Sequence, residues 1–211
     1  PAVANSATIL LDNFDDVIKG IANGIINYEN SSANLNKAVS LAKGNFIKYS
    51  FAPWYKWDGK HSWDRNEASS GVLTEGRVEM WINLKQKQEN PTEILTFNWN
   101  DTAKLPSSGY ILHLGLNAQG NLTYSVWGGN LDKQLIGKTS IPVNTWTHIA
   151  LSWSSNGTKL YVNKEVDAES TANMWPAFNK TVYAYLNYWG ANDLGLIDDF
   201  HILKTAEKIT N

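Results

Sequence analysis

The chain has 211 residues, with 10 tryptophans, 9 tyrosines, no cysteine and a formal net charge of −2. The near-neutral charge gives no basis for nucleic-acid binding, and the missing cysteines exclude a disulfide framework or a thiolate metal site. No run of about 18 apolar residues occurs, so membrane insertion is not expected. Most tryptophans and tyrosines should be buried, but so many leave several for a surface platform that binds a ligand.

Short segments in which apolar and polar residues alternate recur along the chain, with turn residues between them about every 8 to 12 positions. The Asn- and Ser-rich stretch 23–34 is predicted to be a loop, and residues 206–209 are predicted to form one helical turn. The alternating segments predict strands at residues 7–14, 37–41, 46–51, 76–84, 93–99, 110–116, 121–127, 134–137, 181–188 and 194–203.

The stretch 141–168 predicts a meander of three further strands. Its first strand places Ile149, Leu151 and Trp153 on one face, which is the period of two that a half-buried strand requires. Residues 155–157, Ser-Asn-Gly, predict a tight turn because asparagine and glycine tolerate positive φ. A second turn is predicted at 163–164, Asn-Lys. Such a meander buries its apolar face only as part of a larger antiparallel sheet.

The number of short strands indicates an all-β, antiparallel β-sandwich. No segment shows helical periodicity, and no internal repeat or linker is visible, so we expect residues 1–211 to form a single domain. The chain begins at Pro1 without a methionine or a signal peptide, and it stops at Asn211. We therefore expect a module excised from a larger protein, with the other domains of that protein as partners.

Two segments carry a family resemblance. Residues 145–153, Thr-Trp-Thr-His-Ile-Ala-Leu-Ser-Trp, and the hairpin after them, with Asn163 at its turn, form one; residues 76–84 form the other. They resemble the W-x-H-h-A strand, the Y-V-N-G hairpin and the f-T-v-E-x-W-v strand of laminin-G-like domains, although Lys164 replaces the glycine. The resemblance covers about residues 71–205 and implies a jelly roll of the concanavalin A-like type. It fixes no function, because such folds include sugar-binding modules, adhesion domains and enzymes.

The last predicted strand carries a carboxylate, Asp198, on an otherwise apolar face with Leu194, Leu196, Phe200 and Ile202. Asp12 has a similar position in the first strand. First and last strands usually pair in jelly rolls, so the two carboxylates could meet. A carboxylate directed into a core is costly unless it is paired or metal-bound. Oxygen ligands in a chain without cysteine favour Ca²⁺.

The resemblance supports calcium, because residues 195–202, Gly-Leu-Ile-Asp-Asp-Phe-His-Ile, look like the family's final G-x-I-D-D-V-R-I strand. In that strand the aspartate often holds a structural calcium ion, and carbonyl groups of the first strand and of a turn complete the shell. The resemblance thus implies Ca²⁺ bound by Asp198, with Asp12 and Gly44 as further ligands. The alternative is that Asp198 accepts backbone N–H bonds or pairs with a lysine or arginine.

Residues 165–169, Glu-Val-Asp-Ala-Glu, match the Glu-x-Asp-x-Glu pattern of laminarinase-like glycoside hydrolases. On a regular strand Glu165, Asp167 and Glu169 would share one face, and a retaining mechanism needs two carboxyl groups about 5 to 5.5 Å apart. The Trp-Pro-Ala segment of those enzymes also has a counterpart, at 175–177, but here it follows the hairpin instead of preceding it. We therefore interpret the motif as a solvated hairpin and predict no catalytic residue.

Ligand-binding residues are predicted in aromatic loops, because sugar rings stack on aromatic side chains while amides and carboxylates bind their hydroxyl groups. Loops fixed on a rigid sandwich are the usual place for such residues. The alternative is that these aromatic residues close the ends of the sandwich, which we favour for Tyr183 and Tyr185. The predicted ligand-binding residues are Trp54, Tyr55, Trp57, Asp58, Trp63, Trp127, Asn130 and Trp175.

Taken together, the sequence favours non-catalytic binding of a polysaccharide or glycan by a secreted or cell-surface bacterial protein. An adhesion or structural domain with a protein partner, or a spacer, is the first alternative, and a laminarinase-like glycoside hydrolase is the second. His148 and His201 are interpreted as packing between strands, because no third histidine or carboxylate stands at the spacing of a zinc site.

Overall fold

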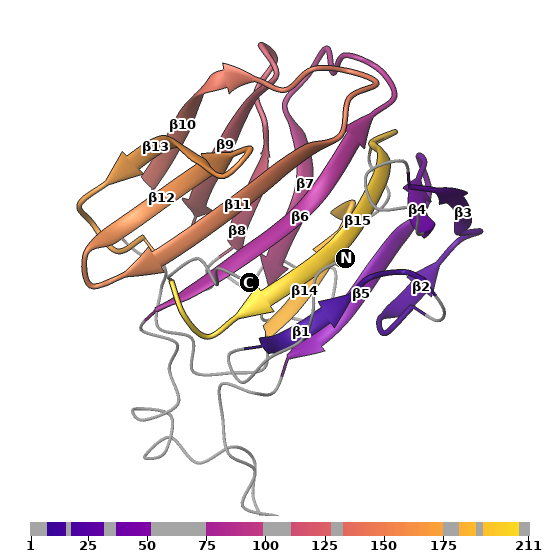
Figure 1. The fold of residues 1–211 in the computed structure, drawn as a ribbon, viewed down its shortest axis with the longest axis horizontal. Coiled ribbons are helices and arrows are strands. Elements are labelled where there is room, and N and C mark those ends of the chain that lie inside the picture. The colour runs from indigo at the N-terminus through magenta and orange to yellow at the C-terminus, as the bar shows by residue number, and fades with distance from the viewer. Residues whose placement is uncertain are drawn as a thin grey trace, which may run out of the picture.

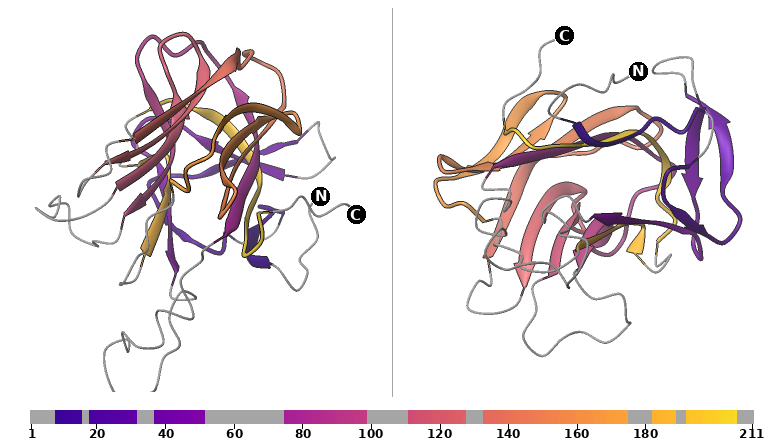
Figure 2. Two further views of the ribbon diagram at one scale, coloured as in Figure 1. Left: turned by 90° about the vertical axis from the view of Figure 1, so that its left-hand side faces the viewer. Right: turned by 90° about the horizontal axis from the view of Figure 1, so that it is seen from below.

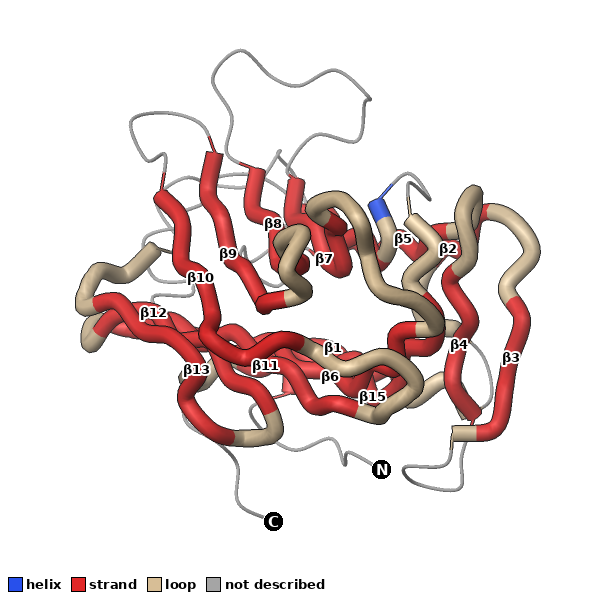
Figure 3. Tube along the Cα trace, turned by 90° about the horizontal axis from the view of Figure 1, so that it is seen from above, coloured by secondary structure: helices blue, strands red, loops and turns tan. Residues whose placement is uncertain are grey.

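The computed structural model describes residues 8–15, 18–31, 37–51, 75–98, 111–127, 133–174, 182–188 and 192–206. These residues form two antiparallel sheets packed face to face, so the predicted all-β sandwich of jelly-roll type is confirmed (Figures 1 and 3). The described part of the chain contains no helix long and apolar enough to cross a membrane.

Sheet A is eight-stranded, and β1 (Thr8–Asp12) joins it by pairing with β15 alone. The order of its other strands is β13 (Glu165–Ser170), β12 (Gly157–Val162), β11 (Thr147–Ser154), β6 (Gly76–Leu84), β15 (Gly195–Leu203), β4 (Lys37–Leu41) and β3 (Asn27–Asn30).

Sheet B is seven-stranded and lies behind sheet A in Figure 1. The edge strands β13 and β10 lie on one side of the sandwich, and β3 and β2 lie on the other (Figure 3). Figure 2 shows the same two layers from the side and from below. The strand order of sheet B is β10 (Lys133–Ser140), β9 (Asn121–Trp127), β8 (Ile111–Leu116), β7 (Thr92–Asn98), β14 (Val182–Leu186), β5 (Phe46–Phe51) and β2 (Ile21–Asn23).

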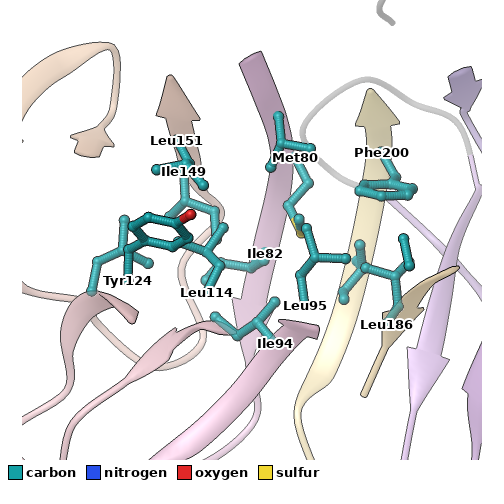
Figure 4. Close-up of a cluster of buried hydrophobic side chains, with 14 of the residues drawn as sticks. Met80, Ile82, Ile94, Leu95, Leu114, Tyr124, Ile149, Leu151, Leu186 and Phe200 are labelled. Carbon is teal, nitrogen blue, oxygen red and sulfur yellow. The ribbon is translucent and has the colours of Figure 1, made fainter. Parts of the chain in front are cut away.

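The core lies between the sheets and follows the alternation seen in the sequence. Ile149, Leu151 and Trp153 are buried as predicted, and Tyr124 reaches across to donate a 3.2 Å hydrogen bond from its hydroxyl to the Met174 carbonyl. Burial raises the pKa of Tyr124 well above its usual range. Figure 4 shows residues of both sheets meeting in this core, among them Met80, Ile82, Leu95, Leu114, Leu186 and Phe200.

Two sequence predictions differ from the structure. The stretch 23–34, predicted to be a loop, contributes β3 and the end of β2, both exposed edge strands. Few apolar residues alternate there because neither strand buries a face. The strand predicted at 134–137 extends over all of β10, and its pairing with β9 shifts register after Ile136. The helical turn predicted at 206–209 lies largely outside the described residues.

Candidate functional site

The face of sheet B that points away from the core carries a row of mostly polar side chains, of which Thr96 and Tyr185 in the middle are buried and Ile21 at one edge is apolar and exposed. Each of its residues alternates with a core residue, so the row follows directly from the period of two. Strand register places the row across all seven strands, a width of about 29 Å at about 4.8 Å per strand. We call this row the outward strip; its residues are Ile21, Lys48, Tyr185, Thr96, His113, Ser125 and Gln134.

One end of the outward strip, on β5 and β14, is aromatic. The Lys48 ammonium lies 4.3 Å from the centroid of the Tyr183 ring and 6.0 Å from that of Tyr185. The ring of Tyr188 meets Tyr185 edge-on with centroids 4.9 Å apart, and the Asn98 amide donates a 3.2 Å hydrogen bond to the Tyr188 hydroxyl. Together these contacts fix an aromatic cluster in which Tyr185 and Asn98 are buried, while Tyr183, Tyr188 and Lys48 are half-buried.

The middle of the strip, on β7 and β8, carries a carboxylate–imidazole pair. The two groups meet at 3.1 Å between Glu93 Oε1 and His113 Nδ1, and the Thr96 hydroxyl lies within hydrogen-bond distance of both groups. Burial alone would raise the pKa of Glu93, but the hydrogen bonds and charge of His113, helped by Thr96, lower this pKa below its usual value. The carboxylate is thus held charged, in position to accept hydrogen bonds from a ligand.

The strip contains the groups that recognise sugars: aromatic surfaces for the C–H faces of a ring, and amide, carboxylate and imidazole groups for its hydroxyls. From sequence, Tyr183 and Tyr185 are possible ligand contacts for which packing is favoured, and nothing in the sequence singles out Lys48, Glu93 or His113. The alternation within β5 and β14 predicts that each strand has an outward face. It does not predict the register that aligns these two segments, which are far apart in the chain.

None of the ligand-binding residues predicted from sequence has a described side chain. Trp54, Tyr55, Trp57, Asp58, Trp63, Asn130 and Trp175 lie outside the described residues, and Trp127 is described only as the last residue of β9. The described strand residues that border the undescribed segments of sheet B lie together at one end of that sheet. On neighbouring strands they are paired with one another, or are one residue away from being paired: Phe51, Val182, Asn98, Ile111, Trp127 and Lys133.

The Glu-x-Asp-x-Glu motif does not present its carboxylates on one face. β13 has a bulge at Asp167, so Val166 opposes Tyr161 while Ala168 opposes Leu160. As a result Glu165 lies on the same face of the sheet as its partner Val162. Glu169 lies on the same face as its partner Lys159, which is the opposite face of the sheet.

The two ends of the motif are exposed, and Glu169 pairs with Lys159 at 3.0 Å. Asp167 is buried instead and accepts hydrogen bonds from the backbone N–H groups of Lys138 and Thr139. The arrangement therefore lacks the pair of carboxylates on one face that a retaining hydrolase requires.

Asp198 is buried, but not on the face predicted from sequence. Ile197 opposes Ile82 and Asp198 opposes Trp81, so Asp198 lies on the outer face of sheet A. A bulge between Asp198 and His201, with Asp199 at φ 49°, then returns the strand to its core-facing register. Because Asp199 is in the left-handed region and forms the bulge, Asp198 and Phe200 point to opposite faces of the sheet, although the sequence alternation predicted that they share one.

The Asp198 carboxylate has one oxygen with a donor and one without. Oδ1 accepts a 2.7 Å hydrogen bond from the Asp199 N–H, while among the described residues neither Oδ2 nor the buried Ser31 hydroxyl has a hydrogen-bond partner. Burial raises the pKa of Asp198 to about 6; the charges of Asp199 and Asp15 add to the rise, and Ser31 and the Asp199 N–H oppose it. This is a buried, oxygen-rich spot with excess negative charge.

The other two predicted calcium ligands are placed differently. Asp12 opposes Phe200 in the β1–β15 pair, so it is close in register to Asp198. Its carboxylate already accepts hydrogen bonds from the Phe14 and Lys19 N–H groups and the Tyr49 hydroxyl. Gly44 lies in the turn after the C-terminal end of β4. β15 runs antiparallel to β4, with Gly195 opposite Leu41 and Ile197 opposite Val39, so Asp198 lies toward the other end of β4 from Gly44. Asp12 lies on the core face of sheet A with Phe200 and Tyr49, whereas Asp198 lies on the outer face. The structure does not bring Asp12 or Gly44 beside the Asp198 carboxylate.

A second charged cluster lies on the outer face of sheet A. Glu79 accepts a 2.6 Å hydrogen bond from buried Arg77, and His148 and His201 approach its two oxygens at 3.6 and 3.7 Å. Burial lowers the pKa of His201, although Glu79 and Asp199 oppose that shift. Among the described residues no group of three histidine, aspartate or glutamate side chains is placed to hold a metal.

Comparisons with solved structures show proteins of the same fold. Domain 4 of the extracellular GH43 arabinanase AbnA from Geobacillus stearothermophilus, in complex with arabinotriose, is 23% identical with a TM-score of 0.58, over 88% of this chain and 78% of that chain. The sialidase CBM40 of Ruminococcus gnavus, bound to α2,3-sialyllactose, is 12% identical with a TM-score of 0.57. The match covers 82% of this chain and 91% of that chain.

Trypanosoma rangeli sialidase is 10% identical with a TM-score of 0.60, over 98% of this chain but only 32% of that chain. At these identities the similarity shows the shared fold. No match was found among curated proteins. A family profile, described as the concanavalin A-like lectin/glucanases superfamily, matches residues 73–208. Since this match covers more than half of the chain, the protein belongs to the concanavalin A-like lectin/glucanase superfamily, with a domain of the laminin-G type.

Proposed function

We propose that this domain binds a glycan without cleaving it, and that an extended sugar chain lies along the outward strip of sheet B. The observation that carries the proposal is the strip itself, in which the Tyr183–Lys48 cluster and the Glu93–His113 pair share one face. Both edges of the strip are open, because Ile21 on β2 is 68% exposed and Gln134 on β10 is exposed. A row of this width accommodates several sugar units rather than one.

The ligands of the structural neighbours agree with this proposal. The arabinanase domain holds arabinotriose, and the sialidase module holds sialyllactose. Both are modules of carbohydrate-active proteins, and one of them is extracellular. We infer the same kind of role and an extracellular or cell-surface location for this chain. The aromatic residues predicted from sequence, Trp54, Trp57 and Trp63 foremost, remain proposed ligand contacts, since their segment attaches next to the strip at Phe51.

The position of the Glu-x-Asp-x-Glu motif supports a non-catalytic role. Glu165 and Glu169 lie on opposite faces of β13, and Asp167 between them is occupied by backbone donors. The pair on the outward strip is a carboxylate and an imidazole, which suits hydrogen bonding to hydroxyl groups better than acid and nucleophile roles at one glycosidic bond.

Binding to a glycan array, followed by titration calorimetry on the best hits, tests the proposal. Tyr183→Ala should weaken binding at least about tenfold, since stacking on an aromatic ring is lost. Tyr161→Ala is a matched control: Tyr161 also lies outward with a cation over its ring, Arg77 at 4.5 Å, but on sheet A. Equal binding by wild type and Tyr183→Ala, or an equal loss in both variants, contradicts the proposed site.

Exposed apolar residues on the edge strands favour a second role, contact with a protein. Ile25 is 79% exposed between β2 and β3, beside exposed Ile21 and Tyr28. A neighbouring domain of the same protein would cover them. Ile25→Ser should then weaken association with that domain and leave glycan binding unchanged.

We further propose that a structural Ca²⁺ ion binds at Asp198. The fit rests on a buried carboxylate oxygen that meets no donor in full hydrogen-bond geometry among the described residues, and on the buried Ser31 hydroxyl, which lies close enough to lower the pKa of Asp198. Hard oxygen groups with excess negative charge are what Ca²⁺ prefers. Asp198 would hold the ion, which would neutralise the buried charge and link β15 to the segment at Ser31. Calorimetric titration should detect Ca²⁺ binding to the wild type and none to Asp198→Asn.

A further inference from the structure

The central strands of sheet B carry one acidic residue and no lysine or arginine. Strands β14, β7, β8 and β9 lie side by side there. Their sequences are Val-Tyr-Ala-Tyr-Leu, Thr-Glu-Ile-Leu-Thr-Phe-Asn, Ile-Leu-His-Leu-Gly-Leu and Asn-Leu-Thr-Tyr-Ser-Val-Trp, so Glu93 is the only acidic residue among them. The lysines in the strands of this sheet are on β5 and β10, outside these four strands. A ligand that crosses the middle of the outward strip therefore meets a carboxylate and no lysine or arginine of the same four strands.

A β-bulge places Glu93 on the outward face. The register of β7 against β8 shifts between Glu93 and Leu95, and the extra residue, Ile94, is buried in the core together with Leu95. Glu93 opposes Gly115 on β8, where a Cβ atom would lie only 2.2 Å from the Thr92 carbonyl oxygen. Gly115 thus leaves the room that the bulged backbone of β7 needs. The bulge and the glycine together fix where the Glu93 side chain leaves the sheet.

The Glu93 carboxylate is oriented by the protein and still has room for a ligand. Oε1 lies 3.1 Å from His113 Nδ1, and Oε2 accepts a 3.1 Å hydrogen bond from the Thr96 hydroxyl. A carboxylate has about four lone-pair positions, so these two partners leave about two of them for incoming donors. The Glu93 side chain is 41% exposed, so a ligand can reach them. On β9, Thr123 opposes Gly115 and adds a half-buried hydroxyl group, which can both donate and accept.

Thr96 acts on a ligand only through Glu93. It is fully buried, so its hydroxyl cannot touch a sugar, and this hydroxyl lies 3.1 Å from Glu93 Oε2 and 3.2 Å from His113 Nδ1. Thr96 is therefore a positioning residue, which keeps the carboxylate and the imidazole in one arrangement.

We propose that Glu93 makes the outward strip selective for neutral glycans, by accepting hydrogen bonds from neighbouring hydroxyl groups of one sugar unit. This inference rests on the proposed function of the same strip and specifies its class of ligand. Hydroxyl groups gain from a charged acceptor, because a charge-assisted hydrogen bond is about twice as strong as a neutral one. A uronic or sialic acid unit would instead place a second carboxylate against the first, and like charges brought together in a binding site suppress the wrong ligand.

The first experiment is a glycan array that holds neutral and acidic members of matched pairs. Lactose is paired with sialyllactose, and methyl-esterified oligogalacturonate is paired with free oligogalacturonate, beside arabinotriose and other neutral glycans. The tightest ligand should be neutral, and in every pair that binds the neutral member should bind about tenfold or more tightly. Added salt should raise the affinity of the acidic member, because screening weakens the repulsion, and should leave that of the neutral member unchanged.

Titration calorimetry with the tightest neutral glycan then tests the residues. Glu93→Gln should weaken binding about tenfold and reduce the preference over acidic glycans, because it keeps the shape and removes the charge. Thr96→Val should weaken binding as well, although Thr96 touches no ligand, and Thr96→Ser should retain it because the hydroxyl is kept. Glu169→Gln is the control: Glu169 is also an exposed carboxylate beside a cation, Lys159 at 3.0 Å, but on sheet A. Thermal melting of every variant reports that it is folded.

The inference is overturned if an acidic glycan is the tightest ligand of the array, or if Glu93→Gln binds the neutral glycan as tightly as the wild type does. In either case the proposed glycan binding itself stands. An equal loss in Thr96→Val and Thr96→Ser would overturn the positioning role of the hydroxyl. Absence of binding to every glycan of the array would instead contradict the proposed function, and this inference with it.

Discussion

Two buried aspartates of sheet A, one at its edge and one on an inner strand, show two ways of keeping a charge out of water. Asp167, at the β13 edge, accepts hydrogen bonds of 3.1 and 3.0 Å from two consecutive N–H groups of β10, so it links the edge strands of the two sheets. Asp198, on β15, has one oxygen bonded to the next N–H of its own chain and one with no partner among the described residues. Protein donors satisfy both oxygens of the first carboxylate, and one oxygen of the second has no donor among the described residues.

Both aspartates lie next to β-bulges, Asp167 at the bulge of β13 and Asp198 just before that of β15. The bulge at Asp167 turns its side chain toward β10, where Gly137 leaves the room, since a Cβ at that residue would collide with Oδ2 of Asp167. The bulge after Asp198 leaves this carboxylate on the outer face of sheet A. Removing each carboxylate should therefore have opposite consequences for stability.

The largest effect is expected for Asp167→Ala, which leaves two backbone N–H groups of β10 without an acceptor. We expect a loss of about 3 kcal/mol in the free energy of unfolding, measured by urea denaturation, since each unsatisfied group costs about 1–3 kcal/mol. Glu169→Ala on the same strand is the control: it removes only an exposed pair with Lys159 and should cost far less than Asp167→Ala. If the two variants lose equal stability, Asp167 does not link the sheets.

Removal of calcium should have the next largest effect, and only through Asp198. At a free Ca²⁺ concentration 100 times the dissociation constant, binding adds about 2.7 kcal/mol to the free energy of unfolding. For a chain of this size that is roughly 5–10 °C in melting temperature, lost when EDTA is added. Asp198→Asn should melt at the same temperature with and without EDTA. An EDTA-insensitive wild type would remove the calcium proposal, and an EDTA effect retained by Asp198→Asn would move the ion elsewhere.

How far the sequence predicted these features differs between the fold and the site. The period of two in 147–153 and in 76–84 predicted strands that the structure confirms, because a half-buried strand must alternate. The same rule misplaced Asp198 and aligned Glu165 with Glu169, since one left-handed or bulged residue reverses the alternation and leaves no clear mark in the sequence. The outward strip could not be predicted because it depends on the register of β5, β14 and β7, which are far apart in the chain.

A smaller effect, of opposite sign to that of Asp167, is expected from the pH dependence of calcium-free protein. The folded-state pKa of Asp198 is raised to about 6 from an ordinary value of 3.8. A raised pKa means that the folded state holds the proton more tightly, so this stabilising contribution is complete below pH 3.8 and is lost as the pH rises through about 6. We expect Asp198→Asn to gain about 1–2 kcal/mol over the wild type at pH 7 in EDTA, after allowance for solvent screening.

Urea denaturation of both proteins between pH 3.5 and 7.5 measures this difference. Taking the difference between wild type and Asp198→Asn cancels other titrating groups, including His201, whose lowered pKa acts in the opposite direction and destabilises the fold as the pH falls. A difference that does not change with pH would show that folding does not raise the pKa of Asp198.

The smallest effect is expected at the hairpin that leads into the Asp167 bulge. Asn163 and Lys164 both have positive φ, 49° and 74°, as a tight two-residue turn requires. Asparagine tolerates this conformation, and its side chain accepts a 3.0 Å hydrogen bond from the His148 N–H. Lysine gains no such bond from its side chain and is strained by its Cβ, so Lys164→Gly should stabilise the protein by about 0.5 kcal/mol.

Lys164→Ala separates strain from charge in this turn, because it removes the ammonium and keeps the Cβ. Urea denaturation should show a gain for glycine and none for alanine. A gain for both variants would instead assign the effect to the charge of Lys164. The gain should persist in an Asp167→Ala background, since strain in the turn and the hydrogen bonds at the bulge involve different atoms. A gain that disappears there would mean that the Asp167 hydrogen bonds to β10 are what hold Lys164 in its left-handed conformation.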